Sequence, residues 1–280
     1  MKLQEIIVRD PFILPVAEEQ SYYLYGSPHT FVNPDGESWN GIYCWKSQDL
    51  DEWTGPFKVF EPLETSLAPC QFWAPEVHCY QNAYYMFVTF PENPQDEHAT
   101  WILRSERPEG PFRIWSEGPL RPEGWRTLDG TLYVDEEGAP WIVFCHEWVQ
   151  IHAGTICAMP LTPDLKCSAG EAVELFHAYD APWALRFGDN QENSVTDGPF
   201  LFHEEGKLKM FWSTIAEGWR YVMGTAVSES GKITGPWKQE PIPFCTGDCG
   251  HGMRFTTFDG KVAVVVHQPN CGDIEHPVFI

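Results

Sequence analysis

The chain has 280 residues, and 40 Asp and Glu against 18 Lys and Arg give it a formal net charge of -22 at pH 7. A charge of this sign repels phosphate backbones and anionic lipid surfaces, so we expect no nucleic acid and no membrane among its partners. Aromatic residues make up 15% of the chain, and 23 Gly and 24 Pro supply many turns, a composition typical of an all-β fold that binds sugar.

All-β folds of this length are commonly single units, so we expect one domain over residues 1–280. The basic N-terminus is not followed by a long apolar stretch, and no segment is apolar enough to span a bilayer, which predicts a cytoplasmic protein. Nine scattered Cys are interpreted as reduced thiols. Cys245 and Cys249, near Asp248 and His251, lack the second cysteine pair that is typical of a zinc site.

In chain order, five segments share one pattern, a polar residue followed by an apolar strand. They are RDPFIL at 9–14, APEVHCY at 74–80, LDGTLYV at 128–134, TDGPFLF at 196–202 and GHGMRFTTF at 250–258. Each is followed by turn-forming residues and a second, strongly apolar run, such as SYYLYGS at 21–27. The chain therefore predicts five strand-turn-strand hairpins.

Further strand segments follow four of the hairpins. A Gly-Pro-aromatic triplet recurs at 55–57, 110–112 and 235–237, which fits a turn into an outer edge strand where Pro is tolerated. Such repeats are typical of propeller blades. The sequence thus predicts an all-β, five-bladed β-propeller with four antiparallel strands per blade, in which N-terminal residues such as LQEIIV at 3–8 close the fifth blade.

The first strand of a propeller blade lines the central channel, so residues at its start in all five blades meet at one mouth. The polar residues at that register are Asp10, Glu76, Asp129, Asp197 and His251. Crowded carboxyl groups raise one another's pKa, which is what acid/base chemistry near neutral pH requires. An Asp before Gly or Pro is by itself most often a turn residue, but turn chemistry does not require acids at one register in different blades.

The second strand of each hairpin returns to the same mouth and predicts further residues at its rim. These are His29, Phe90, His146, Glu147, Trp148, Ser213 and His267. Trp73, Trp148 and Trp183 are candidate platforms for a sugar ring, although packing in the core explains most of the 13 Trp.

In order and register these motifs resemble glycoside hydrolase family 43, five-bladed propeller enzymes that include α-L-arabinofuranosidases, arabinanases, β-xylosidases and exo-galactosidases. The resemblance is carried by RDPF, WAPE, LDGTLYVDEEG, VTDGPFL, GHGM and VVVHQPN, and it covers nearly the full chain. It implies an inverting mechanism, with Asp10 as the general base and Asp129 as the acid that orients the general acid and tunes its pKa. It also matches His251 to a channel histidine beside a water-coordinated ion, so a structural calcium ion is an option, and no cofactor is required.

The chain departs from this family in blade four, where a Glu in an EGP motif normally acts as general acid and Asp197 stands here. Asp is one methylene shorter, and a general acid must reach hydrogen-bond distance of the glycosidic oxygen. Glu147 and Glu192 are therefore rival proton donors.

These features predict an inverting hydrolase of neutral oligosaccharides that contain arabinose, xylose or galactose, first of all an exo-acting α-L-arabinofuranosidase of hemicellulose degradation. The pocket that exo action needs depends on insertions at 33–41 and 91–100, which would wall off one end of the channel. The alternatives are an endo-arabinanase or a β-xylosidase, a fructan- or sucrose-acting propeller hydrolase, a carbohydrate-binding propeller with a degenerate general acid, and a protein-interaction propeller.

Overall fold

The computed structural model describes residues 1–28, 41–62, 71–93 and 96–280. Blade one contains β1 (Val8–Val16), β2 (Ser21–Pro28), β3 (Ile42–Ser47) and β4 (Trp53–Phe60). Blade two contains β5 (Trp73–Tyr80), β6 (Ala83–Phe90), β7 (Ala99–Ser105) and β8 (Arg113–Ile114). Blade three contains β9 (Thr127–Val134), β10 (Pro140–His146), β11 (Thr155–Pro160) and β12 (Val173–His177).

Blade four contains β13 (Asp197–Glu204), β14 (Lys207–Ala216), β15 (Arg220–Ser228) and β16 (Trp237–Gln239), and blade five contains β17 (Gly250–Thr256), β18 (Val262–Gln268) and β19 (His276–Phe279). The helical elements are short: α1 (Trp148–Ile151), η1 (Leu3–Glu5), η2 (Ala17–Glu19), η4 (Ala178–Asp180), η5 (Glu217–Trp219) and η6 (Gly272–Ile274). None of the helices in the described ranges is long and apolar enough to cross a membrane.

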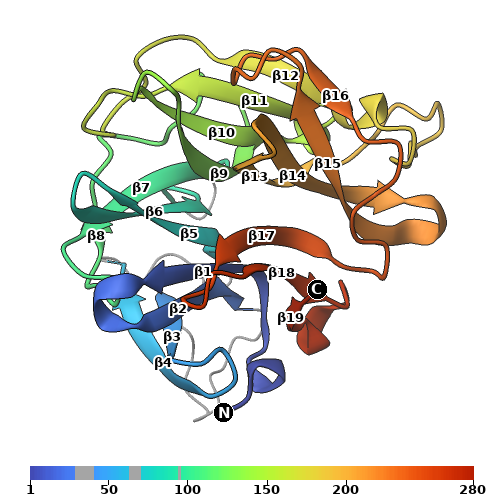
Figure 1. The fold of residues 1–280 in the computed structure, drawn as a ribbon. Coiled ribbons are helices and arrows are strands. Elements are labelled where there is room, and N and C mark those ends of the chain that lie inside the picture. The colour runs from blue at the N-terminus through green and yellow to red at the C-terminus, as the bar shows by residue number, and fades with distance from the viewer. Residues whose placement is uncertain (29–40, 63–70, 94–95) are drawn as a thin grey trace.

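The five sheets surround a common centre, and the first strand of each lies innermost (Figure 1). Contacts join β1 to β5, β5 to β9, β9 to β13, β13 to β17, and β17 back to β1, so the ring is closed. The prediction of an all-β, five-bladed propeller is confirmed. The N-terminal residues lie at the fifth blade as predicted, although they form the turn η1 against β19 instead of a strand of that sheet.

Each innermost strand has a β-bulge at the same mouth of the channel, where the pairing with the second strand shifts register. The residue with positive φ in the bulge is Asp10 (52°), Ala74 (45°), Asp129 (56°), Gly198 (51°) or His251 (43°). Left-handed φ is uncommon for residues other than Gly, and a bulge re-aims the side chains beside it. The fold therefore turns five equivalent positions toward one mouth.

This bulge corrects the predicted register. Asp10, Asp129 and His251 are equivalent, whereas Asp197 stands one residue before its bulge position and Glu76 two residues after. Because a bulge sets two successive residues against one partner, the position before it also faces the mouth. Asp197 therefore still reaches the mouth, and Glu76 points elsewhere.

A second repeated contact joins each bulge to the preceding blade. At three junctions the N–H of the bulge residue donates to a hydroxyl: Ala74 to Ser27 Oγ (2.6 Å), Asp129 to Thr89 Oγ1 (2.9 Å) and His251 to Ser213 Oγ (2.7 Å). At a fourth junction the N–H of Asp10 donates to His267 Nδ1 at 3.2 Å. At the remaining junction, the N–H of Gly198 donates to Asp129 Oδ2 at 3.0 Å. These contacts satisfy backbone donors that would otherwise be buried without a partner.

Apolar side chains fill the space between the blades, in clusters that join blades one, two and five and blades three and four. Trp53 and Trp212 are fully buried there. Trp183 packs on Trp212, with ring centroids 5.0 Å apart, and its Nε1 donates to the Glu240 carbonyl. Trp183, predicted as a possible sugar platform, therefore belongs to the packing of blade four.

The cysteines differ in one respect from the prediction of nine reduced thiols. Cys245 and Cys249, just before β17, form a disulfide. The bond uses the two thiols that the sequence placed near Asp248 and His251, so they do not form a metal site. Six other cysteines in the described ranges are free thiols, and Cys70 lies outside those ranges.

Candidate active site

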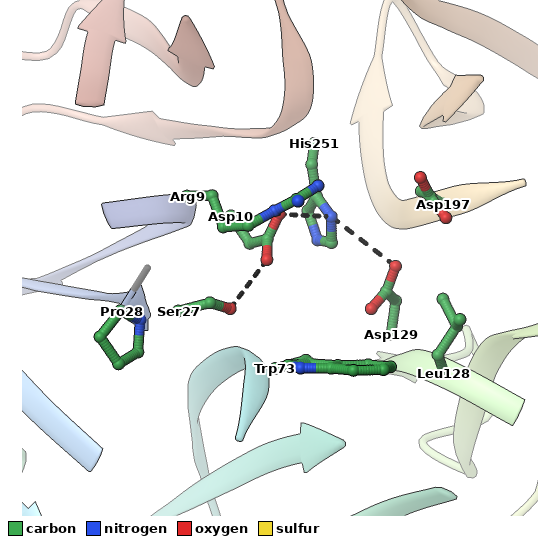
Figure 2. A pocket seen from close by; sticks show the side chains of 9 residues that line it. All are labelled: Arg9, Asp10, Ser27, Pro28, Trp73, Leu128, Asp129, Asp197 and His251. Carbon is green, nitrogen blue, oxygen red and sulfur yellow. Dashed lines mark hydrogen bonds and ion pairs between the residues drawn. The ribbon is translucent and has the colours of Figure 1, made fainter. Parts of the chain in front are cut away.

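A cavity of about 310 Å³ lies at the mouth where the bulges meet (Figure 2). It is lined by Arg9, Asp10, Ser27, Pro28, Trp73, Leu128, Asp129, Asp197 and His251. Seven of these residues occupy a bulge position or the position before it, so the repeated bulge builds the cavity. Five predicted site residues are brought together here, namely Asp10, Trp73, Asp129, Asp197 and His251.

Asp10 is buried and surrounded by donors. Ser27 Oγ donates to its Oδ2 at 2.8 Å, and Arg9 Nε donates to its Oδ1 at 3.2 Å. Burial alone would raise the pKa of Asp10, but the positive charges of His251 and Arg9 outweigh it and hold that pKa well below its usual range. Asp10 is therefore the carboxylate of the cavity that stays ionised and can accept a proton.

His251 lies between two carboxyl groups. Its Nδ1 is 3.1 Å from Asp10 Oδ1 and 3.7 Å from Asp129 Oδ2. Burial lowers the pKa of this imidazole, but the two nearby carboxylates raise it to about 10, so the ring is positively charged at neutral pH. A Cβ on Gly198 would lie 2.6 Å from the ring of His251, so only glycine leaves room for the imidazole there.

The pKa of Asp129 is raised, whereas that of Asp10 is lowered. Asp129 is buried, its Oδ2 accepts the Gly198 N–H at 3.0 Å, and burial together with the charges of Asp197 and Asp10 raises its pKa to about 7. The positive charge of His251 partly offsets this rise. Asp129 thus changes protonation state near neutral pH.

Asp197 stands across the cavity from Asp10, with Asp129 between them (Figure 2). The hydroxyl of the buried Tyr221 donates to Asp197 Oδ2 at 3.0 Å. Burial raises the pKa of Asp197, and the charges of His251 and Arg9 and the bond from Tyr221 moderate the rise. A carboxyl group with a raised pKa, opposite an ionised one, is the arrangement of a general acid facing a general base.

Trp73 forms one side of the cavity. Its indole stacks on His98, with centroids 3.8 Å apart and planes inclined by 8°. Figure 2 shows the ring lying flat beside the carboxyl groups. A flat apolar face next to hydrogen-bonding groups is suited to a sugar ring.

The model of the family described as glycosyl hydrolases family 43 matches residues 5–277. The chain belongs to this family. Because its members and the structural relatives below are glycoside hydrolases, the protein is a glycoside hydrolase, as predicted.

Solved structures of the family agree over the whole length of the chain. An endo-arabinase from Bacteroides thetaiotaomicron VPI-5482 is 37% identical, with a TM-score of 0.89 over 100% of this chain and 95% of that one. A thermostable family-43 glycoside hydrolase is 24% identical (TM-score 0.78, 97% and 88% covered). An endo-1,4-β-xylanase from the same Bacteroides strain is 23% identical (TM-score 0.76, 98% and 90% covered). The last two likenesses show the fold alone.

Several residues predicted at the rim of this family 43 site lie outside the cavity lining. Ser213 and His267 are fully buried and hold the bulge N–H groups of His251 and Asp10, so they position the site. Burial lowers the pKa of His267 to about 4, and its Nδ1 accepts the Asp10 N–H, so the ring is neutral.

The remaining predicted positions are held by other contacts. Glu76 accepts the Thr131 hydroxyl at 2.5 Å, Phe90 stacks on Trp101, and His146 stacks on Trp125. His29 and most of the insertion at 33–41 lie outside the described residues.

The rival proton donors also lie outside the cavity lining. Glu147 forms an ion pair with Arg126, while burial raises its pKa and the charge of Asp197 adds to the rise. Glu192 accepts the backbone N–H of Asn190 at 2.8 Å. The carboxyl groups of raised pKa that line the cavity are therefore Asp129 and Asp197.

Three contributors to the family 43 site were not predicted from the sequence. Arg9 and Ser27 bind Asp10, and Tyr221 binds Asp197. Ser27 has a detectable signal, because it occupies the same register in its second strand as Ser213 and His267 do in theirs. Tyr221 has no such signal, since it reaches Asp197 on β13 from β15, with β14 between the two strands.

The option of a structural calcium ion that His251 holds through water stays a prediction, and the protein groups that His251 faces are acids. His251 Nδ1 faces the carboxylates of Asp10 and Asp129 as an ion-pair partner, and its positive charge opposes a cation. Across the described residues, no cluster of three or more His, Cys, Asp or Glu could hold a metal ion. We therefore assign no chemical step to a metal.

Proposed function

We propose that this family 43 glycoside hydrolase cleaves α-L-arabinofuranosyl linkages in a neutral saccharide with inversion of configuration. The observation that carries this proposal is one cavity lined by three carboxyl groups, in which Asp10 is held ionised while the pKa values of Asp129 and Asp197 are raised. The choice of arabinose rests on the similarity to a protein named as an endo-arabinase.

In the proposed reaction, water lies beside Asp10 and attacks the anomeric carbon. Asp10 takes a proton from that water as the new C–O bond forms. Asp197 gives its proton to the glycosidic oxygen as the bond to the leaving sugar breaks. Asp129 and His251 supply the charged groups next to Asp10 and Asp197, and the Tyr221 hydroxyl orients the Asp197 carboxyl.

The mode of action was predicted to be exo, on the basis of insertions that wall off the channel. Residues 33–40 and 94–95 of those insertions lie outside the described residues. Endo action is therefore the alternative. The similarity to the 37% identical structure, which is named as an endo-arabinase, favours it. Products from linear arabinan decide between them, because exo action releases only one small product from the start and endo action releases a ladder of oligosaccharides.

The test of the proposed function is release of 4-nitrophenol from the α-L-arabinofuranoside, the β-D-xyloside and the β-D-galactoside. We expect turnover of the arabinofuranoside by wild type and none by Asp10→Asn. Asp197→Asn is expected to retain activity on this activated substrate but to lose it on arabino-oligosaccharides, because only a poor leaving group needs the proton. Glu147→Gln is the matched carboxyl control.

Three results would contradict parts of this assignment. Preferred cleavage of the xyloside or galactoside would change the sugar. If the activity of Glu147→Gln, and not that of Asp197→Asn, depended on the leaving group, Glu147 would be the general acid. Sugar binding without turnover of any substrate would leave a carbohydrate-binding propeller.

A further inference from the structure

Outside the cavity, three aromatic side chains form a continuous aromatic row, defined here as Trp148, Phe187 and Trp219. The ring centroids of Trp148 and Phe187 are 5.1 Å apart, and those of Phe187 and Trp219 are 5.2 Å apart. Trp148 and Phe187 are partly buried, whereas Trp219 is 65% exposed. The row therefore presents an apolar surface to solvent.

The two ends of the row are next to residues that interact with Asp197. Trp148 directly follows Glu147, whose pKa is raised in part by the charge of Asp197. Trp219 stands two residues before Tyr221, whose hydroxyl binds Asp197. Phe187 lies in the connection from β12 to β13, and β13 begins with Asp197. All three rings thus lie on connections at the end of the blades that carries the cavity.

The backbone at Trp219 is unfavourable for such a large residue. Gly218 and Trp219 both have positive φ, at 76° and 58°. A bulky side chain in this region of backbone space is a strained outlier, and such outliers cluster at ligand-binding sites. The strain exposes the indole instead of burying it, so core packing does not account for it.

We propose that the aromatic row binds the part of a neutral saccharide chain that extends beyond the cavity. This inference rests on the proposed function, because that same chain would be the substrate. Aromatic faces stack on the apolar faces of sugar rings, and a neutral ligand is not repelled by a protein of net charge -22. The row makes the enzyme prefer long substrates.

The test compares kcat/KM for the disaccharide and the hexasaccharide of linear α-1,5-arabinan. Wild type is expected to prefer the hexasaccharide, and Trp219→Ala and Phe187→Ala are each expected to lower that preference roughly three- to tenfold, as expected for one lost aromatic contact. Trp219→Phe should restore part of it. Phe244→Ala is the matched control, because Phe244 is 50% exposed and lines a different cavity together with Glu204, which ends β13. This control is expected to keep the wild-type preference.

Two outcomes separate failure of the row from failure of the proposed function. If wild type cleaves the oligosaccharides and both alanine variants keep the wild-type length preference, the row does not bind substrate. If wild type cleaves none of them, the proposed function fails, and the row is tested by tryptophan fluorescence titration with the hexasaccharide. Weaker binding by Phe187→Ala than by Phe244→Ala then supports the row, and equal binding overturns it.

Discussion

Asp10 and His251 occupy the same bulge position in adjacent blades, and Nδ1 of the imidazole lies 3.1 Å from Oδ1 of the carboxylate. Each group stabilises the charge of the other: the pKa of Asp10 is held low, and that of His251 is raised to about 10. The pair also stands beside Asp129, so one imidazolium balances two acids. The closing junction of the propeller, between blades five and one, therefore contains the ion pair that holds Asp10 ionised.

Replacing His251 by Gln is expected to shift the acidic limb of the pH profile of kcat/KM to higher pH. The variant removes the positive charge that lowers the pKa of Asp10, so the base loses its proton only at a higher pH. Profiles measured with the 4-nitrophenyl glycoside report this limb. His203→Gln, an exposed histidine on β13, is the control and should leave the limb in place. An unmoved acidic limb in His251→Gln would show that Asp10 is not the base.

Tyr221→Phe is expected to move the alkaline limb to higher pH while lowering kcat on oligosaccharides. The hydroxyl stabilises the ionised form of Asp197, so its removal raises the pKa of that acid, which then keeps its proton to a higher pH. The loss of kcat follows from the loss of a contact that orients the donor. Tyr25→Phe is the control, because that buried hydroxyl on β2 donates to the Pro108 carbonyl, in the connection between β7 and β8 of blade two. Equal behaviour of the two variants would contradict the role of Asp197 as acid.

The five blades and the meeting of Asp10, Asp129 and His251 were predictable, because a repeated hairpin and a repeated polar register are visible in the sequence. The different register of Asp197 and Glu76 was not, because a bulge inserts a residue without a composition signal at that point. The sequence predicts the correct end of the strand for Ser213 and His267 but does not predict their contacts. Their partners are backbone N–H groups of the next blade, which no side-chain pattern reveals.

Asp129→Asn is expected to raise the thermal midpoint of unfolding at pH values well above 7, even though it impairs catalysis. The pKa of Asp129 is raised to about 7 by burial and by the neighbouring acids, so its ionised form destabilises the fold. This cost is absent below the ordinary pKa of about 4, grows as the pH rises from about 4 to about 7, and is fully present above 7. Asn stays neutral and still offers an oxygen to the Gly198 N–H.

Thermal unfolding scans from acidic to alkaline pH test the sign of the stability difference between wild type and Asp129→Asn. The midpoints of wild type and Asp129→Asn should approach each other in acid and separate in alkali, with the variant more stable. The exposed Asp259→Asn is the control, because the pKa of Asp259 is lowered to about 2 by hydrogen bonds with Lys261 and Thr257. A variant less stable than wild type at alkaline pH would mean that ionised Asp129 stabilises the site.

Gly198→Ala and Gly206→Ala form a matched pair that separates backbone strain from the need for space. Both glycines have positive φ, at 51° and 74°, so each alanine adds a similar strain of about 1 kcal/mol. At Gly206 nothing lies within 4 Å of the new Cβ, whereas at Gly198 the Cβ would lie 2.6 Å from the ring of His251. Gly198→Ala should therefore lose more stability in urea and should also displace the imidazole from Asp10.

We expect Gly206→Ala to keep wild-type kcat/KM and Gly198→Ala to lose it, with an acidic limb shifted in the same direction as in His251→Gln. If the two variants kept equal activity, the close packing of Gly198 against His251 would not be what holds the charge pair in place.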